Sequence, residues 1–439
     1  MMCGKKLCRL LVILMVLAVL AGCAKPSGPV VSDADISDSD VSGFDLAEPD
    51  DEGETAEPFV PTVSFAFNNL DLRGSKKPLR IVGVAADGST TFDRTFSNYY
   101  NEPLAYAETP DDGLIIAVAT ECRNRPVMAD GGLIYWKEPV RGELVRLDKD
   151  GKTIWKYPLA KNIDIINRIT VSPDGDIYTA GIFRDVEDVE DQSAVKGFYK
   201  FFDTTSSSFE KFSNSLRLMR ITPDGLLAES LIISPGSFFK FYSVETLFSP
   251  RGELVVLTES SPGYGTEKVH LRAYDDKLEV VWESLVSEFD GGSLGLYGNK
   301  IIVGDYPDTR YAYFSLSGKL LETHIIHPGT YAWGEVSLDA YFVKTNDGEL
   351  FLCRDGEEIL VDTYDAYPGQ IRIASLWDGR FIVQVESVHE DEHTRDFWYE
   401  YSYYMYDRDG NPLEYIGWLL PNGAPYPLKK DCLIPLTWW

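Results

Sequence analysis

The chain has 439 residues and a formal net charge of −28 at pH 7, from 69 acidic and 41 basic side chains. Such an acidic protein repels nucleic acid and anionic lipid headgroups, so we expect neither as a partner of the folded part. Only 6 cysteines occur, without any C-x-x-C pair, so a structural metal site and thioredoxin-like chemistry are not indicated.

The first 22 residues read as a secretory signal. Lys5, Lys6 and Arg9 precede an apolar run, LLVILMVLAVL, which is too short to span a membrane. The run ends at LAGC, which puts Cys23 where an ordinary signal has a small-residue cleavage site. These features resemble a bacterial lipoprotein signal. The resemblance implies a signal peptide over 1–22, acylation of Cys23, and a protein anchored in the lipid bilayer at the extracytoplasmic face of a bacterial cell membrane, at the cell surface or in the periplasm.

An acidic tether follows. Residues 24–60 hold 11 Asp and Glu against one Lys, with Ser, Gly and Pro between them. Such a segment cannot bury enough apolar surface to fold, so residues 23–61 are predicted to be a disordered, lipidated tether. The signal carries three positive charges and the tether a net −10, so −21 of the total charge of −28 lies on residues 61–439.

Three thiols remain if Cys23 is acylated. Cys122, Cys353 and Cys432 allow one disulfide at most, and the sequence leaves its pairing open. We expect each of them to be a small buried side chain.

From about residue 78 the chain repeats a short strand, a turn with Asp and Gly, and a second strand. Seven copies of one hairpin occur, including LVRLDKDGKTIWKYPL and YYMYDRDGNPLEYIGWL, and six copies of a second hairpin alternate with them, including TVSPDGDIYTAGIF and ASLWDGRFIVQVE. Two hairpins make a four-stranded unit, and units recurring every 40 to 75 residues or so are typical of a β-propeller.

The two ends of the chain complete one another. The first copy, IVGVAADGSTTFDRTF, supplies only an outer hairpin, and the last segment, PLKKDCLIPLTWW, reads as an inner hairpin without an outer one. We therefore predict an all-β fold over residues 62–439, a β-propeller of seven four-stranded blades, the last of them shared by the N- and C-terminal segments. That closure pairs the strand edges at both ends.

Two repeat motifs resemble those of known propeller families. LDKDGKTIW, with Trp155 four residues after Gly151, resembles the quinoprotein-like repeat, and SPDGDIY resembles the NHL-like repeat. Similar lipoprotein propellers include an outer-membrane assembly factor that resembles quinoproteins but binds no quinone. The resemblance implies the fold and no catalytic residue or cofactor. Trp155 and Trp282 are expected to pack between blades.

Three enzyme motifs occur outside their usual context. HEDEH at 389–393 matches the HExxH of zinc proteases, but strand-like segments flank it, so we place His389 to Arg395 in a loop between strands and expect no zinc there. GGSLG at 291–295 lacks the helix of a nucleophile elbow, and GKT at 151–153 lacks the earlier glycine of a phosphate loop. The Asp-Gly turns lack the later ligands of a calcium loop.

Alternating strand direction divides the connections between two faces. If the strands of a blade are A to D from the axis outward, A–B and C–D turns share one face, and B–C and D–A connections share the other. The short Asp-Gly turns belong to the first face and the long loops to the second, with a loop at 121–131 as the main exception. Aromatic, His and Arg side chains on long loops suit sugar stacking or protein anchoring. The predicted ligand-binding residues are Tyr199, Tyr264, Tyr306, Arg310, Tyr331, Trp333, His389, His393 and Trp398.

The sequence therefore predicts a membrane-anchored, monomeric propeller that binds or scaffolds a protein or glycan through its loop-rich face. No catalytic residue, cofactor or metal is assigned. One alternative is a cell-surface polysaccharide lyase or hydrolase, because His, Arg, Tyr and acidic residues are available on the same face. The other is an envelope-assembly scaffold. The ligand, the type of envelope and the occupancy of the axial channel stay open.

Overall fold

The computed structural model describes residues 62–68, 78–100, 103–129, 132–159, 165–184, 214–233, 240–261, 268–286, 289, 292–305, 310–325, 332–337, 340–376, 379–390, 397–413 and 433–435. These residues belong to one structural unit, Thr55–Trp439. The predicted signal (1–22), tether (23–61) and acylated Cys23 lie outside them. In the described part of the chain, no helix is both long and apolar enough to cross a membrane.

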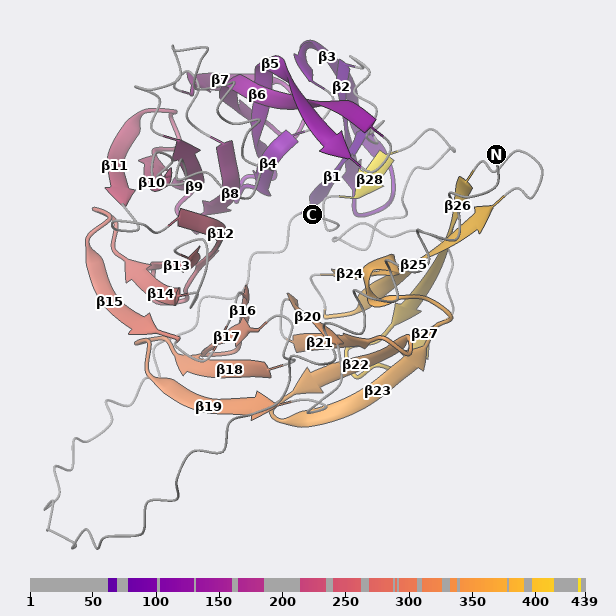
Figure 1. Ribbon diagram of the computed structural model, residues 1–439. Coiled ribbons are helices and arrows are strands. Elements are labelled where there is room, and N and C mark those ends of the chain that lie inside the picture. The colour runs from indigo at the N-terminus through magenta and orange to yellow at the C-terminus, as the bar shows by residue number, and fades with distance from the viewer. Residues whose placement is uncertain are drawn as a thin grey trace, which may run out of the picture. The chain divides into compact units, whose positions relative to one another are not determined.

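Seven antiparallel sheets of four strands form the blades of a β-propeller (Figure 1). From the inner to the outer strand, blade 1 contains β28 (Leu433–Pro435), β1 (Val63–Asn68), β2 (Pro78–Ala85) and β3 (Thr90–Tyr100); blade 2 contains β4 (Pro103–Glu108), β5 (Leu114–Ala129), β6 (Gly132–Leu147) and β7 (Thr153–Pro158); blade 3 contains β8 (Ile165–Val171), β9 (Ile177–Arg184), β10 (Asn214–Ile221) and β11 (Leu227–Ile233).

The remaining blades follow in chain order. Blade 4 contains β12 (Lys240–Phe248), β13 (Leu254–Ser261), β14 (Lys268–Tyr274) and β15 (Val280–Leu285); blade 5 contains β16 (Ser293–Tyr297), β17 (Lys300–Gly304), β18 (Arg310–Ser315) and β19 (Leu320–Ile325); blade 6 contains β20 (Ala332–Ser337), β21 (Ala340–Thr345), β22 (Glu349–Arg354) and β23 (Glu357–Thr363); blade 7 contains β24 (Ile371–Ser375), β25 (Phe381–Glu390), β26 (Phe397–Tyr406) and β27 (Pro412–Leu413). A short 3-10 helix, η3 (Pro368–Gln370), precedes β24.

The predicted all-β propeller of seven blades, one of them shared by the chain ends, is confirmed. The predicted division of strands in the shared blade is wrong. The C-terminal segment contributes one described strand, β28, and the N-terminal segment contributes three, because β1 (VSFAFN) fills the second position. Strand β28 pairs with β1 through Ala66, Phe67 and Asn68.

The five-residue Asp-Gly turns close their hairpins with the same two hydrogen bonds. In blade 2 the amide of Gly151 donates to the carbonyl of Asp148, and the amide of Asp148 donates to the carbonyl of Lys152, both at 2.9 Å. Gly151 has φ +70°, the left-handed region that a type I turn followed by a bulge requires. In the blade 4 turn, Leu278 takes this position with φ 59°.

Aromatic side chains of several outer strands pack against a turn of the next blade. A Cβ added at Gly318, in the C–D turn of blade 5, would lie 2.2 Å from the ring of Trp282 in blade 4. Trp155 of blade 2 covers Gly225 of blade 3 in the same way and donates from Nε1 to the carbonyl of Pro223 at 2.7 Å. The two tryptophans thus pack between blades, as expected from the sequence.

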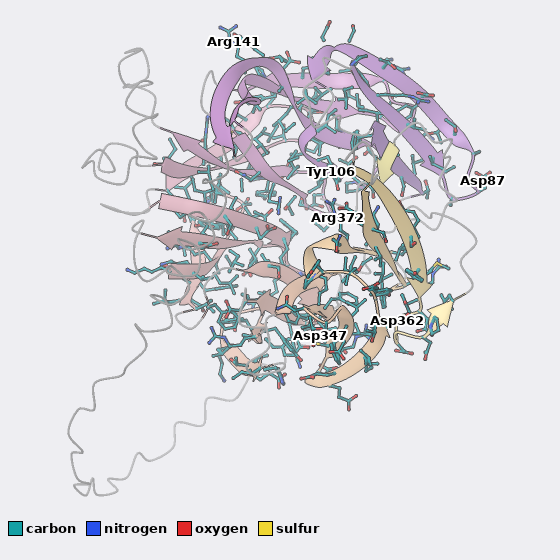
Figure 2. The ribbon with its side chains drawn as sticks, turned by 45° about the vertical axis from the view of Figure 1, so that its right-hand side comes forward. Asp87, Tyr106, Arg141, Asp347, Asp362 and Arg372 are labelled. Atoms are coloured by element: carbon teal, nitrogen blue, oxygen red, sulfur yellow. The ribbon has the colours of Figure 1, made fainter. Side chains whose placement is uncertain are left out.

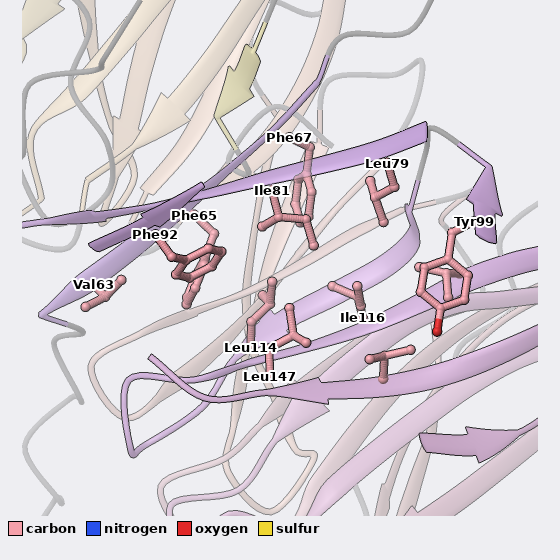
Figure 3. Close-up of a cluster of buried hydrophobic side chains, with 12 residues drawn as sticks. Val63, Phe65, Phe67, Leu79, Ile81, Phe92, Tyr99, Leu114, Ile116 and Leu147 are labelled. Atoms are coloured by element: carbon pink, nitrogen blue, oxygen red, sulfur yellow. The ribbon is translucent and has the colours of Figure 1, made fainter. Parts of the chain in front are cut away.

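The core lies between neighbouring sheets. Figure 3 shows the cluster between blades 1 and 2, in which buried side chains from β1, β2 and β3 pack against those of β5 and β6. Alternation along the strands explains the cluster, since Val63, Phe65 and Phe67 of β1 point to one face. The blade built from both chain ends is therefore packed as a regular blade.

Two predicted loops are wrong because the strands run further than their sequence suggested. Strand β5 continues to Ala129 and pairs with β6 up to Gly132, so residues 121–129 form part of a long hairpin. Strand β25 continues to Glu390, with His389 opposite Trp398 and Glu390 opposite Phe397. His389 therefore lies in a strand and not in a loop.

Candidate functional site

The two faces of the ring differ in the length of their connections, as the sequence predicted. Every A–B and C–D turn between the strands above has two to five residues. The B–C and D–A connections are as short as two residues in places but include 185–213 in blade 3 and 414–432 before β28. The ring thus carries its longest connections on one side.

The predicted ligand-binding residues fall into two groups. Tyr199, Tyr264, Tyr306, Tyr331 and His393 lie outside the described residues. The other four lie at or near strand ends on the face with the long connections, in three different blades. They are Arg310 of β18, Trp333 of β20, His389 of β25 and Trp398 of β26. The backbone register puts His389 opposite Trp398, and a role for any of the nine residues stays a prediction.

Arg310 is held by the scaffold. Its Nη2 lies 2.6 Å and its Nε 2.9 Å from Oδ2 of Asp305, whose side chain is fully buried. The guanidinium also lies over the ring of Phe289, 5.4 Å from its centroid. The hydroxyl of Tyr341 donates to the carbonyl of Asp305 at 3.3 Å. Arg310 and Asp305, the residues on either side of 306–309, therefore form an ion pair, because a buried carboxylate needs a cation beside it.

Sequence reasoning missed a cluster of polar residues on the inner strands β4, β8 and β12. These strands belong to consecutive blades and contact one another. Arg168 of β8 binds both carboxylate oxygens of Glu245 of β12, with Nε 2.6 Å from Oε2. Beside this pair, the hydroxyls of Thr170 and Thr246 are 2.7 Å apart. The ion pair consequently ties blade 3 to blade 4 near the axis.

Tyr106 and Glu108 of β4 extend the cluster towards blade 1. Tyr106 packs on Phe67, with ring centroids 5.6 Å apart. Both carboxylate oxygens of Glu108 are shielded from solvent and have no hydrogen-bond partner in the described part of the chain. Burial, and secondarily the charge of Asp112, raise the pKa of Glu108 to about 8. Burial, followed by the charge of Glu108, also raises the pKa of Tyr106 well above its usual range.

Figure 2 shows Tyr106 and Arg372, from the inner strands β4 and β24, near the middle of the ring, whereas Asp87 and Arg141 lie at its periphery. At neutral pH the raised pKa keeps the shielded carboxyl group of Glu108 mostly protonated, and Arg168 and Glu245 neutralise one another. The cluster had a weak signal in the sequence, namely single polar residues within the inner-strand segments LAYAE, INRITV and YSVETLF.

No metal-binding site is evident among the residues that the structure describes. Groups of three or more His, Cys, Asp or Glu side chains that could hold an ion are absent from those residues. The first half of the HExxH match, His389-Glu390, is extended strand, so these two residues do not take up the helical geometry that such zinc sites use.

No protein-family model and no curated protein sequence matches the chain. Among solved structures, a candidate 6-phosphogluconolactonase from Bacteroides fragilis is 11% identical, with a TM-score of 0.41 over 82% of this chain and 99% of that chain. A prolyl endopeptidase is 12% identical, with a TM-score of 0.42, over 81% of this chain and 48% of that chain. BamB from Moraxella catarrhalis is 11% identical, with a TM-score of 0.34, over 73% of this chain and 95% of that chain. Similarity at this level concerns the fold alone.

Proposed function

We propose that this protein is a lipid-anchored, extracytoplasmic binding propeller, which holds a protein or glycan at the face bearing its B–C and D–A connections and does not transform it. The asymmetry between the two faces carries the proposal: uniformly short turns on one side, and connections such as 185–213 on the other. Loops on a rigid scaffold are where proteins place recognition residues.

The anchor follows from the segment ahead of the ring. An acylated Cys23 would contribute about 0.8 kcal/mol for each buried methylene, and several chains together give lasting attachment. The acidic tether of residues 23–61 would span roughly 35 Å as a flexible chain and more under its own charge repulsion. The ring would then stand clear of the headgroups that its negative charge repels.

Replacement of Cys23 tests the anchor. We expect Cys23→Ser to leave an unprocessed precursor or to release the protein from membranes, as seen by fractionation and by the mass of the mature chain. Cys8→Ser is the matched control, because this cysteine lies within the predicted signal and should leave processing unchanged. Normal processing and membrane retention of Cys23→Ser would refute the lipoprotein assignment.

Direct titration tests the binding role. Oligosaccharides of β-linked hexose and N-acetylhexosamine units are suitable probes, with calorimetry for binding and mass spectrometry for cleavage. We expect saturable binding without product, weakened by Trp333→Ala and Trp398→Ala and unaffected by Ile154→Ala on an outer strand. Cleaved product would establish the lyase or hydrolase instead. A failure of every sugar to bind would exclude the glycan and leave a protein ligand to be sought by cross-linking on the same face.

A further inference from the structure

The outer strands of the blades expose aliphatic side chains to an unusual degree. Val281 and Leu285 of β15 are 50% and 55% exposed, and Leu321 and Ile325 of β19 are 46% and 59% exposed. Each outer strand has a partner on one side only in the sheet order. An edge strand with apolar side chains offers both backbone hydrogen bonds and side-chain contacts to another strand, so natural proteins usually protect such edges.

Most of the outer strands carry such protection. A charge or a proline interrupts the exposed row of side chains on four of them: Asp93 on β3, Lys156 and Pro158 on β7, Glu283 on β15 and Glu358 on β23. On β11 the row is Ala228, Ser230 and Ile232, and the guanidinium of Arg217 lies 3.1 Å from the hydroxyl of Ser230. Strand β27 has only two residues.

Strand β19 has no comparable protection. Its exposed row contains Leu321, Thr323 and Ile325, without a charge or a proline. The charged Glu322 belongs to the other face of the strand, where it lies 3.3 Å from Nζ of Lys300. His324 also belongs to that face and stacks on Tyr311, with ring centroids 4.8 Å apart. The charged Glu322 and the ring of His324 thus lie on the face towards blade 6, and the exposed row holds two aliphatic side chains and the uncharged Thr323.

Acidic groups flank this apolar row. On the blade 4 side, Glu279 and Glu283 are exposed, with Glu283 already bound by Arg272, and on the blade 6 side, Glu357 and Glu358 are exposed. Residues 61–439 as a whole carry −21, and the exposed Glu279, Glu357 and Glu358 outnumber the exposed Lys319 that directly precedes β19. A partner that fits this edge must combine an extended backbone and aliphatic side chains with positive charges at both ends.

We propose that β19 is a docking edge for an extended strand of a partner protein, in which alternating aliphatic residues contact Leu321 and Ile325 and flanking Lys or Arg residues meet the neighbouring carboxylates. The partner strand adds to blade 5 as a fifth strand. This contact is on the outer rim and is separate from the face assigned to ligand binding.

A synthetic heptapeptide in which isoleucine alternates with threonine between terminal lysines is the probe, titrated into the full chain in detergent. We expect saturable binding and slower amide hydrogen exchange across Leu320–Ile325. Leu321→Glu should weaken the affinity by about tenfold or more, and Val281→Glu, the same position on β15, should change it by no more than about twofold. A peptide N-methylated on alternate amides should lose binding, because it lacks the donors for pairing.

Four outcomes would overturn the proposal. The first three are that the wild-type chain fails to bind the peptide, that Leu321→Glu and Val281→Glu weaken binding equally, and that the N-methylated peptide binds as well as its parent. The fourth is that sedimentation without peptide shows a dimer that Leu321→Glu dissociates, which would make a second copy of the chain the occupant. Equal urea unfolding midpoints for both variants and wild type establish that each variant is folded.

Discussion

Glu108 shows how strongly one residue depends on its surroundings. Its carboxyl group lies at the inner edge of blade 2, shielded from solvent and without a hydrogen-bond partner in the described part of the chain. The sequence around it, LAYAETP, gave no sign of burial, because an acidic residue before a turn is ordinarily exposed. Its strand is enclosed by contacts that are distant in sequence: β4 lies against β8 of blade 3, and Phe67 of blade 1 packs on Tyr106, two residues before Glu108.

The raised pKa of Glu108 predicts a loss of stability with rising pH. The folded protein keeps the proton up to a pKa of about 8, whereas an unfolded glutamate loses it near 4.5. Between these values the folded state binds more protons, so this contribution is complete below pH 4.5 and is lost as pH rises through about 8. Glu108→Gln should flatten the pH dependence of the unfolding free energy by on the order of a few kcal/mol.

Urea unfolding at several values from about pH 5 to 9 measures this effect. Glu229→Gln, on the exposed outer strand β11, is the control and should keep the wild-type slope. A Glu108→Gln profile parallel to wild type would mean that the carboxyl group is ionised in the folded protein at neutral pH.

Alanine substitutions at Gly318 and Gly252 distinguish the cost of backbone strain from the cost of a clash between blades. Both have φ near +80°, so alanine at either position should cost about 1 kcal/mol in the left-handed region. A Cβ at Gly252 meets nothing within 4 Å, whereas one at Gly318 would lie 2.2 Å from the Trp282 ring. We expect Gly318→Ala to reduce the unfolding free energy by about 1–3 kcal/mol more than Gly252→Ala. Equal losses in urea titrations would show that Trp282 does not press on this turn.

At the scale of elements, turn chemistry is what the sequence predicts best. A glycine in the turn, usually after Asp, located six of the seven C–D hairpins, because a left-handed residue is needed there and glycine supplies it. Even the blade 4 turn, where Leu278 takes that position, was recognised from the alternation on either side. Strand ends were predicted less well. Strand β1 was missed and β25 was cut short, since neither the start of β1 nor the end of β25 carries a turn signal.

The extended form of β25 makes a prediction about zinc. Residues in a strand rise about 3.3 Å each and alternate in direction, whereas the HExxH site needs both histidines on one face of a helix. We expect the purified chain to hold sub-stoichiometric zinc by elemental analysis, and Glu390→Gln to leave peptide hydrolysis unchanged. One tightly bound zinc per chain, lost in a His389→Gln, His393→Gln variant, would contradict this and favour a protease.

At the scale of the whole molecule, the architecture followed from the repeat, and the candidate site did not. Seven hairpins of one kind, alternating with six of another, were enough to predict seven blades and a shared closure. The inner-strand cluster escaped prediction because Arg168 and Glu245 are 77 residues apart and meet only when two blades stand side by side. Spacing within a repeat says little about contacts between repeats.

The closure of the ring can be tested by two truncations. Removal of residues 433–439 deletes β28 and exposes the edge of β1 at Ala66, Phe67 and Asn68. We expect a fall in the unfolding free energy of roughly 2 kcal/mol or more, with broadened urea transitions and light scattering from edge association. Removal of 436–439 is the control, since β28 stays intact. A protein without 433–439 that unfolds like wild type would show that β28 does not hold the ring together.

The pairing of β28 with β1 also determines when blade 1 can be completed during synthesis. Ala66 is opposite Pro435, so blade 1 brings together residues about 370 positions apart, the slowest kind of contact to form. Strands β1 to β3 are made before those of the other six blades, yet their sheet stays one strand short until β28 has been made. While the other six blades are being made, the nascent chain therefore carries an open edge at β1 that a chaperone or another nascent chain can reach. The first blade to begin is thus the last to be completed.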